Sequence, residues 1–415
     1  MVPNIIVLMV DDMGWQDLSV PLYRDSTAAN HRYLTPAIAQ LAAQGVSFTD
    51  AYATAPVGMP TRAALLTGRP AAVAASSASI SSLPRWLRSA GYRTIHIGKT
   101  DWGATGASAA EVKALGFDES RPGARRADTL TADAIREMDI ALAMQKPFFL
   151  YLAYDAVHLP STGDSRFIAA SRARGLDERD VLFASLIAGV DDSVRDIVAY
   201  LDTHVLTART LIVLLSDNGG LTSPLRSGRR NVQNAPLRSG MGSAYEGGLR
   251  VPMIVRWPGV ARVGFRASTP VSAQDLFPTV LLAARVPNVA TITRGMSGQD
   301  LASTLGNTTP VPFDRPLLWH VAEYTTSAVP GSDPFSAIRA GIWKLIYFYV
   351  GSRYELYDLS NDIGEARELS LKQPEIAAQL SELLRRALTD ANVSMPLDSA
   401  YGRPFALPGR LLVPR

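Results

Sequence analysis

The sequence has no cysteine among its 415 residues. Disulfide bonds, thiolate-bound metals and a cysteine nucleophile are therefore excluded. It also lacks an apolar run long enough to span a membrane. The first residues, 1–4, lead straight into an apolar segment, with no charged and apolar leader before it. We expect a soluble chain without a signal peptide, or one from which a leader has been removed.

The chain also carries little net charge, because 41 Lys and Arg residues against 38 Asp and Glu residues give a formal charge of only +3. No basic run is interleaved with aromatic residues in the way that marks a nucleic-acid-binding track. Nucleic acid is therefore excluded as a partner. Hydrophobic residues make up 47% of the chain, which is enough for one large domain and a smaller one.

Two short apolar runs, 5–10 and 210–215, end in acidic residues and have the length of buried strands. Such runs alternate with segments of helical periodicity, which predicts an α/β fold with a mostly parallel or mixed central sheet flanked by helices. Further strands are expected at 94–97, 148–153 and 253–256, and helices at 35–44, 83–90, 130–143 and 181–201.

The pattern of expected elements changes after the proline-containing stretch 309–316. Short strands are expected within 336–350 and 354–359, followed by one helix over 374–392. We predict a large α/β domain over 1–312 and a smaller C-terminal α+β domain with a short antiparallel sheet over 313–395. The proline-rich stretch 396–415 is expected to be an extended tail.

Acidic and amide side chains follow the two apolar runs: Asp11 and Asp12 after the first, Asp217 and Asn218 after the second. Ligands of open α/β sheets bind beyond the carboxyl ends of the strands, where these residues fall. Carboxylate and amide oxygens suit Ca²⁺ or Mg²⁺. The alternative is that each Asp caps a following helix. Because two such groups occur together, we favour a metal site.

The segment 55–69 is the most informative, since it reads Gly58, Met59, Pro60, Thr61, Arg62 and then continues to Leu66, Thr67 and Gly68. It resembles the signature of the formylglycine-dependent type I sulfatases, in which Cys or Ser is followed by any residue, Pro, any residue and Arg, and then by a helix ending in Leu-Thr-Gly. That family belongs to the alkaline-phosphatase superfamily. The resemblance continues through ordered blocks at 4–14, 91–99, 147–158, 216–220, 245–252, 338–345 and 355–359.

This resemblance implies an alkaline-phosphatase-like fold and a role for each matching residue. Asp11, Asp12, Asp217 and Asn218 would bind Ca²⁺, with Mg²⁺ as the alternative cation. Arg62 and Lys99 would orient and stabilise the formylglycine hydrate. His158 would contact the sulfate ester and assist the leaving oxygen, although a histidine that follows an apolar strand is more often a packing or capping residue.

Three positions depart from the family pattern. Gly58 stands where the Cys or Ser that becomes formylglycine is expected, and glycine has no side chain to oxidise. Asp101 stands where a histidine usually assists breakdown of the covalent sulfate. Met241 replaces a lysine expected to bind the sulfate, and methionine cannot neutralise an anion. Thr61, the nearest hydroxyl, lies at a variable position of the motif and is a poor candidate nucleophile.

The sequence therefore predicts a sulfatase-family protein that is impaired or inactive in sulfuric ester hydrolysis and binds a sulfated or phosphorylated small molecule or glycan. One alternative is an active sulfatase whose formylglycine is written as glycine. Another is a metal-dependent phosphate or phosphonate ester hydrolase, and a third is an interaction protein that uses the fold as a scaffold. By analogy with the family, a periplasmic or secreted location is expected.

Overall fold

An eight-stranded sheet, in the order β5-β4-β6-β1-β7-β8-β2-β9, forms the centre of the larger part of the molecule. The computed structural model describes residues 2–24, 26–69, 82–100, 109–123, 126–155, 157, 162–222, 233–306, 315–323, 329–398, 401–409 and 411. The strands are β1 (Asn4–Val10), β2 (Val46–Phe48), β4 (Arg93–Gly98), β5 (Glu119–Pro122), β6 (Phe148–Tyr154), β7 (Thr210–Ser216), β8 (Met253–Arg256) and β9 (Phe265–Ala267).

The sheet is mixed, as expected. Strands β5, β4, β6, β1 and β7 are parallel neighbours, whereas β8 runs antiparallel to both β7 and β2. Every residue of β1, β6 and β7 is buried, which explains their continuous apolar sequences, because helices cover both faces of these strands. A separate two-stranded parallel pair joins β3 (Ala51–Tyr52) to β10 (Val271–Ser272).

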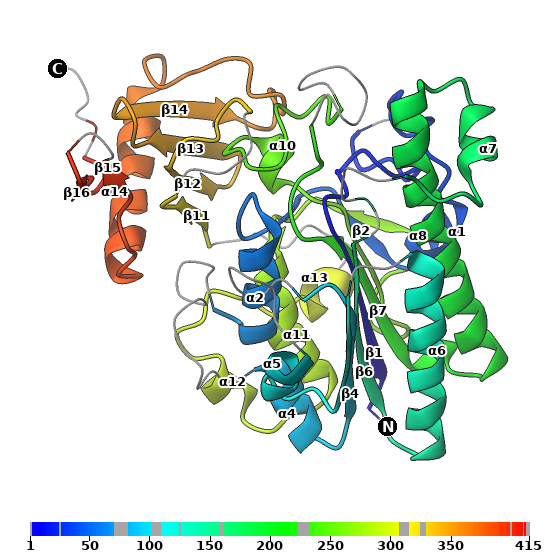
Figure 1. Cartoon of the computed structure of the whole chain (residues 1–415). Coiled ribbons are helices and arrows are strands. Elements are labelled where there is room, and N and C mark those ends of the chain that lie inside the picture. Colours follow the sequence, from blue (N-terminus) through cyan, green and yellow to red (C-terminus); the bar gives the residue numbers. More distant parts are fainter. Residues whose placement is uncertain are drawn as a thin grey trace.

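Helices cover both faces of the sheet, and Figure 1 shows the two layers on either side of it. One layer contains α1 (Pro36–Ala43), α6 (Ala127–Ala143), α7 (Ile168–Arg172) and α8 (Glu178–Thr203). The other contains α2 (Gly58–Thr67), α4 (Leu83–Ser89), α5 (Ala109–Ala114), α11 (Leu276–Ala283), α12 (Val289–Ile292) and α13 (Ala302–Gly306). Alternate β1 residues supply the two cores: Ile6 and Leu8 face the first layer, Ile5 and Val7 the second.

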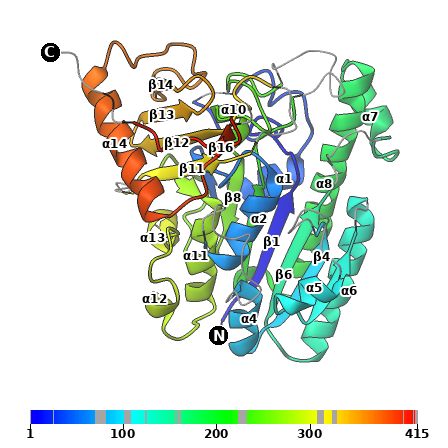
Figure 2. The same ribbon diagram turned by 60° about the vertical axis from the view of Figure 1, so that its left-hand side comes forward.

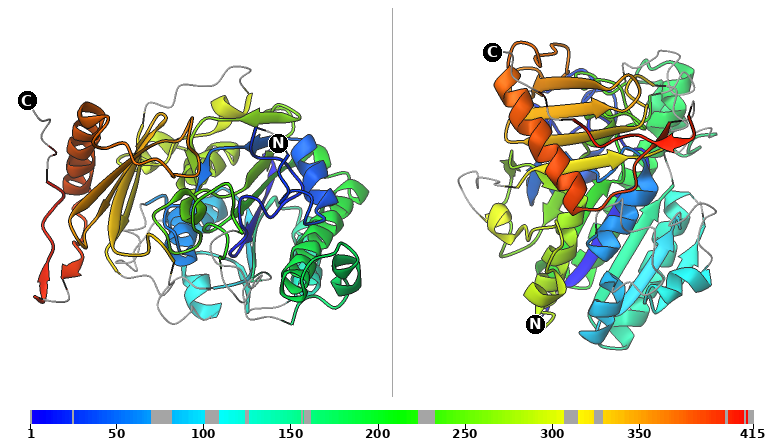
Figure 3. Two further views of the ribbon diagram at one scale, coloured as in Figure 1. Left: turned by 90° about the horizontal axis from the view of Figure 1, so that it is seen from above. Right: turned by 90° about the vertical axis from the view of Figure 1, so that its left-hand side faces the viewer.

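A second, four-stranded antiparallel sheet follows in the C-terminal part, in the order β11-β12-β13-β14. Its strands are β11 (Leu317–Val321), β12 (Phe335–Ala340), β13 (Trp343–Phe348) and β14 (Arg353–Asp358). The expected stretch 336–350 contains two strands, because the chain turns at Gly341, whose φ of 59° suits glycine. Helix α14 (Pro374–Asp390) packs on one face of this sheet (Figures 2 and 3).

The other face of the smaller sheet packs against the larger domain. Phe335 and Phe348 share a buried cluster with Tyr245 and Leu249, which lie at α10 (Glu246–Leu249). The proline-rich end, expected to be extended, also contains a short antiparallel pair, β15 (Leu397–Asp398) and β16 (Arg403–Pro404). No helix within the described ranges is both long enough and apolar enough to cross a membrane. The exact domain boundaries stay a prediction.

Candidate active site

The register of β1 and β7 brings the four expected metal ligands together. The strands are parallel neighbours, and Val10 lies opposite Ser216, so the residues that follow both strands emerge side by side at one edge of the sheet. The Asp12 amide donates to Asp217 Oδ1 at 3.3 Å, and Asn218 Nδ2 donates to Asp12 Oδ1 at 2.8 Å. Asp11, Asp12, Asp217 and Asn218 are all at most 4% exposed. We call these four residues the central cluster.

Two cations reach into the central cluster from other elements. Arg62, on α2, donates from Nη1 to Asp11 Oδ1 at 3.2 Å and also to Asp217 Oδ2. Lys99 follows β4, and its Nζ lies 2.5 Å from Asp11 Oδ2 and 3.2 Å from Asp155 Oδ1. Arg62 and Lys99, to which the resemblance gave a role at the formylglycine hydrate, thus contact carboxylates of the central cluster.

The charges in the cluster act unequally on its two bridging carboxylates. Burial raises the pKa of Asp11, but Lys99 and Arg62 outweigh burial, and the net pKa is lowered. Burial raises the pKa of Asp217, the nearby Asp11 raises it further, and Arg62 only partly opposes them, so it stands well above its usual value.

Gly58 is the first residue of α2, and a side chain at this position would point at the centre of the central cluster. A Cβ atom placed on Gly58 would approach Asp217 Oδ2 and Arg62 Nη1 more closely than real Cβ atoms approach their neighbours. The space that a nucleophile would need is filled by the ends of these two side chains. Thr61, one turn along, is directed elsewhere: its Oγ1 accepts a hydrogen bond from the Thr54 amide at 3.1 Å.

Met241 lies on a loop that borders the cluster. Its amide donates to Gly220 O at 3.0 Å, and the next residue, Gly242, donates to Pro56 O at 2.8 Å. The loop therefore joins the segment after β7 to the segment that leads into Gly58. The other two predicted site residues, Asp101 and His158, lie outside the described residues.

Two residues that the sequence reasoning missed lie beside the cluster. Asp155 follows β6, the strand next to β1, and pairs with Lys99. The rule that selected Asp11 and Asp217, an acid directly after a buried strand, would have found it. Tyr151 is fully buried in β6, and burial raises its pKa, while Arg62 lowers it and the charges of Asp217 and Asp11 raise it further. No sequence pattern distinguishes Tyr151 from an ordinary core tyrosine.

The donor set fits a hard divalent cation in its chemistry. Three carboxylates and one amide converge. Within the part of the chain that the structure describes, however, no three His, Cys, Asp or Glu side chains have the arrangement of a metal site. Arg62 Nη1 instead bridges Asp11 and Asp217. A cation at this place would require the Arg62 guanidinium to move aside.

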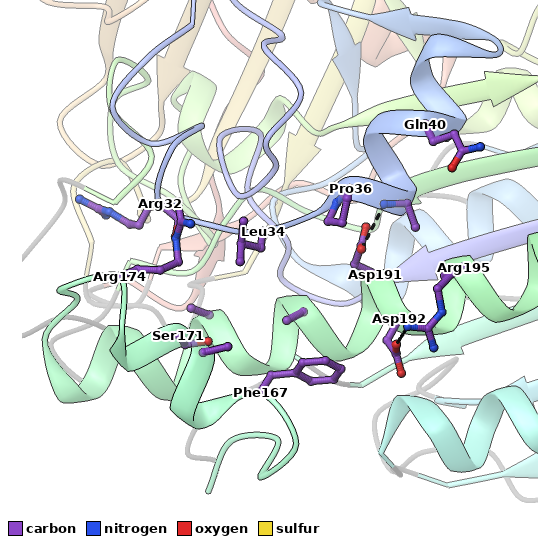
Figure 4. Close-up of a pocket in the computed structure, with 14 residues that line it drawn as sticks. Arg32, Leu34, Pro36, Gln40, Phe167, Ser171, Arg174, Asp191, Asp192 and Arg195 are labelled. Carbon is purple, nitrogen blue, oxygen red and sulfur yellow. Dashed lines mark hydrogen bonds and ion pairs between the residues drawn. The ribbon is translucent and has the colours of Figure 1, made fainter.

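A separate cavity of about 360 Å³ lies between α1, α7 and α8 (Figure 4). None of the predicted site residues lines it. Asp191, at its wall, accepts hydrogen bonds from the amides of Ala37 and Ile38 at 3.1 and 2.8 Å and so caps α1. Burial raises the pKa of Asp191 to about 6. This arrangement accounts for Asp191 as a structural residue.

Comparison with known proteins agrees with the fold. The Sulfatase family profile matches residues 3–286, and the profile of the N-sulphoglucosamine sulphohydrolase C-terminal region matches residues 242–393. The chain belongs to the sulfatase family. The resemblance in the sequence and the expected alkaline-phosphatase-like architecture are both confirmed.

The relatives match over most of their length. A sulfatase of Formosa agariphila is 27% identical, covering 94% of this chain and 89% of that protein. Human arylsulfatase A is 28% identical, and the match covers 98% of this chain and 92% of that protein. Mouse N-acetylgalactosamine-6-sulfatase is 27% identical, covering 77% and 68%.

Solved structures share the fold. Ps i-CgsB in complex with k-i-k-neocarrahexaose superimposes with a TM-score of 0.80 at 26% identity, covering 94% of this chain and 92% of that chain. The phosphonate monoester hydrolase of Agrobacterium radiobacter has a TM-score of 0.66 at 18% identity, covering 94% and 96%. The latter likeness concerns the fold alone.

Proposed function

We propose that this sulfatase-family protein binds a sulfated or phosphorylated small molecule or glycan at the central cluster and has little or no sulfuric ester hydrolase activity. The observation that carries the proposal is Gly58. A side chain at position 58 would point at Asp217 and Arg62 in the central cluster. Glycine, however, presents no atom that could attack sulfur. The residues that would bind the ligand are thus present, whereas the group that would attack its sulfur atom is missing.

Asp11, Asp12, Asp217 and Asn218 would hold a Ca²⁺ ion, with Mg²⁺ as the alternative. Such an ion supplies positive charge that attracts an anionic ester and polarises its oxygens. It would also favour the ionised form of Asp217, whose pKa is raised by burial and by the nearby Asp11. Support for the ion comes from the chemistry and convergence of these four side chains.

The chain's own cations would orient the anion. Arg62 presents a planar guanidinium suited to two oxygens of a sulfate or phosphate. Burial lowers the pKa of Lys99, but the nearby Asp11 and Asp155 outweigh burial and raise it, so Lys99 stays charged. Met241 contributes no charge at its position, and loss of one preorganised contact of this kind costs about a hundredfold or more in rate. His158 and Asp101 are the proposed groups for proton transfer near the ester.

The proposed ligand class draws support from the relatives. One is an N-acetylgalactosamine-6-sulfatase, and one structural neighbour is complexed with k-i-k-neocarrahexaose. A glycan that carries sulfate groups is therefore the first ligand to test. A periplasmic or secreted location, proposed from the family, would place the protein where such glycans occur.

Peptide mass spectrometry of the segment that contains Gly58 tests the proposal first. Unmodified glycine is expected. The same sample is then assayed with an aryl sulfate in the presence of Ca²⁺, and with phosphate and phosphonate esters in the presence of Ca²⁺, Mn²⁺ or Zn²⁺. No turnover is expected, together with measurable binding of the aryl sulfate. An aldehyde at position 58 with turnover would identify an ordinary sulfatase, and turnover of a phosphorus ester alone would identify a different hydrolase.

A further inference from the structure

A cavity of about 520 Å³ lies between the larger domain and the smaller sheet, apart from the central cluster. It opens at the carboxyl ends of β2 and β9, where Thr49, Asp50 and Arg266 line it. These ends lie at the same edge of the sheet as those of β1 and β7, because β8 is antiparallel to both β7 and β2. Three strand spacings separate β1 from β2, which is about 14 Å. None of the predicted site residues lines this cavity.

Four arginines line the cavity, and two of them are neutralised within the protein. Arg250 Nε donates to Glu246 Oε2 at 2.7 Å, and Arg339 Nη2 lies 2.8 Å from Asp50 Oδ1. These pairs belong to a buried network in which Lys344 and Glu365 supply one further charge of each sign. With three cations and three carboxylates, this network is close to neutral when all six are ionised.

The other two arginines, Arg24 and Arg266, add positive charge that this network does not balance. Arg266 Nη1 donates to Pro21 O at 3.2 Å and to Tyr23 O at 3.0 Å, and Arg24 Nη2 donates to Ser360 O at 2.7 Å. Over the described ranges, only carbonyl oxygens accept from these two guanidiniums. Carbonyls fix the positions of the side chains and leave their charge and further donors for an anion.

An apolar and aromatic lining accompanies this charge. Trp15 is 1% exposed, and its indole Nε1 is a buried donor for which the described residues offer no acceptor. Ile342, on the turn between β12 and β13, is 46% exposed at the cavity. Leu22 and Leu359 are buried beside them. The ring of a ligand could pack on Ile342, in front of these buried side chains, while its anionic substituent contacts Arg24 and Arg266.

We propose that this cavity is a second binding site, for a ring compound that carries an oxyanion, such as a sulfated, phosphorylated or carboxylated sugar or aryl group. Arg24 and Arg266 bind the oxyanion, and Ile342 contacts the ring, with the buried Trp15 behind it in the cavity wall. The site is independent of Gly58 and of any metal at the central cluster.

Calorimetric titrations with phenyl sulfate, phenyl phosphate, benzoate and the neutral phenyl β-glucoside test this assignment and identify which oxyanion is preferred. The double variant Arg24→Gln/Arg266→Gln is expected to weaken binding of the preferred anion at least about tenfold, because charged hydrogen bonds are lost. Arg262→Gln, which removes an exposed arginine outside the cavity lining, is the matched control and should leave binding unchanged. Equal binding by both variants would overturn the proposal, as would equal affinity for the neutral glucoside.

Because Arg266 also supports the backbone at residues 21–24, a second pair of variants leaves that support in place. Ile342→Glu places a carboxylate at the exposed lip of the cavity and should repel the anion, whereas Ile342→Gln should bind nearly as the wild type does. If both bind alike, the proposal fails. The same titrations in an Arg62→Gln background separate the two sites, because this variant impairs binding at the central cluster alone. In that background, Ile342→Glu should weaken binding of the anion as much as it does in the wild-type background.

Discussion

Lys344 Nζ donates to Glu246 Oε1 at 2.9 Å, and through this contact the smaller sheet is joined to α10 of the larger domain. The same Nζ donates to Glu365 Oε1 at 2.9 Å, and all three side chains are fully buried. Burial raises the pKa of Glu246, but Lys344 and Arg250 outweigh burial and lower it. Burial and the nearby Glu246 raise the pKa of Glu365 to about 7, despite Lys344.

We expect Lys344→Met to lower the free energy of unfolding by about 3–5 kcal/mol, because it leaves the buried Glu365 without its cation and Glu246 with Arg250 alone. Urea denaturation followed by tryptophan fluorescence measures this. Lys372→Met, at an exposed position before α14, is the control and should change stability by less than about 0.5 kcal/mol. A small effect of Lys344→Met would show that the triad contributes little to the domain junction.

Asp191 gives a prediction for the dependence of stability on pH. Its pKa is about 6 in the folded protein against 3.8 in the unfolded chain, so between these values the folded state binds more protons. Stability should therefore fall as pH rises from about 4 to about 6. Asp191→Asn keeps one of the two oxygens that accept from the amides of α1, and it cannot ionise. Its free energy of unfolding, measured relative to that of the wild type, should therefore rise by on the order of 2–3 kcal/mol between pH 3.5 and pH 7, whatever constant difference the lost acceptor causes.

Urea denaturation of both proteins at these two pH values measures the Asp191 effect. Asp202→Asn, exposed near the end of α8, is the control. The raised pKa of Asp191 would be contradicted if the free energies of unfolding of wild type and Asp191→Asn differed by the same amount at both pH values.

The nucleophile position can be tested by restoring it. Gly58→Cys recreates the signature of Cys, any residue, Pro, any residue and Arg, and in a host that oxidises such cysteines an aldehyde is expected at position 58. Hydrolysis of 4-nitrophenyl sulfate should stay low, because Met241 supplies no charge and the new side chain must displace the ends of Asp217 and Arg62. Adding Met241→Lys should raise the rate about a hundredfold. Full activity of the single variant would show that position 241 is unimportant.

The metal proposal predicts that Ca²⁺ binds and raises the melting temperature. Asp12→Asn removes one of the carboxylates and should weaken calcium affinity at least about tenfold, since Ca²⁺ affinity depends on the number of charged ligands. Asp390→Asn, exposed at the end of α14, is the control. Calorimetry gives the affinities, and calcium binding that is identical in both variants would exclude the central cluster as the site.

The sheet and the central cluster could be predicted from sequence because both depend on local patterns. Continuous apolar strands followed by Asp11 and Asp217 are readable in a single stretch, and the geometry of a parallel sheet then brings their ends together. Arg62 and Lys99 were selected only through the family resemblance, and their contacts with carboxylates were not predicted, because nothing in their local sequence indicates which carboxylate they meet.

The buried ionic network and the second cavity could not be predicted. Arg24 and Arg266 are 242 positions apart, and Glu246 lies 98 positions from Lys344. Helical or strand periodicity does not indicate that such charges are buried or that they meet. The β15–β16 pair was missed for another reason: two-residue strands among prolines carry no alternation that could be detected.

The register of β1 and β7 has a consequence for how this family changes over evolutionary time. Asp11 and Asp217 are positioned by backbone hydrogen bonds of the sheet, and position 58 belongs to a separate helix, whose Arg62 contacts both carboxylates. An exchange at position 58 can therefore remove or restore the attacking group, while the strands that position Asp11 and Asp217 stay unchanged.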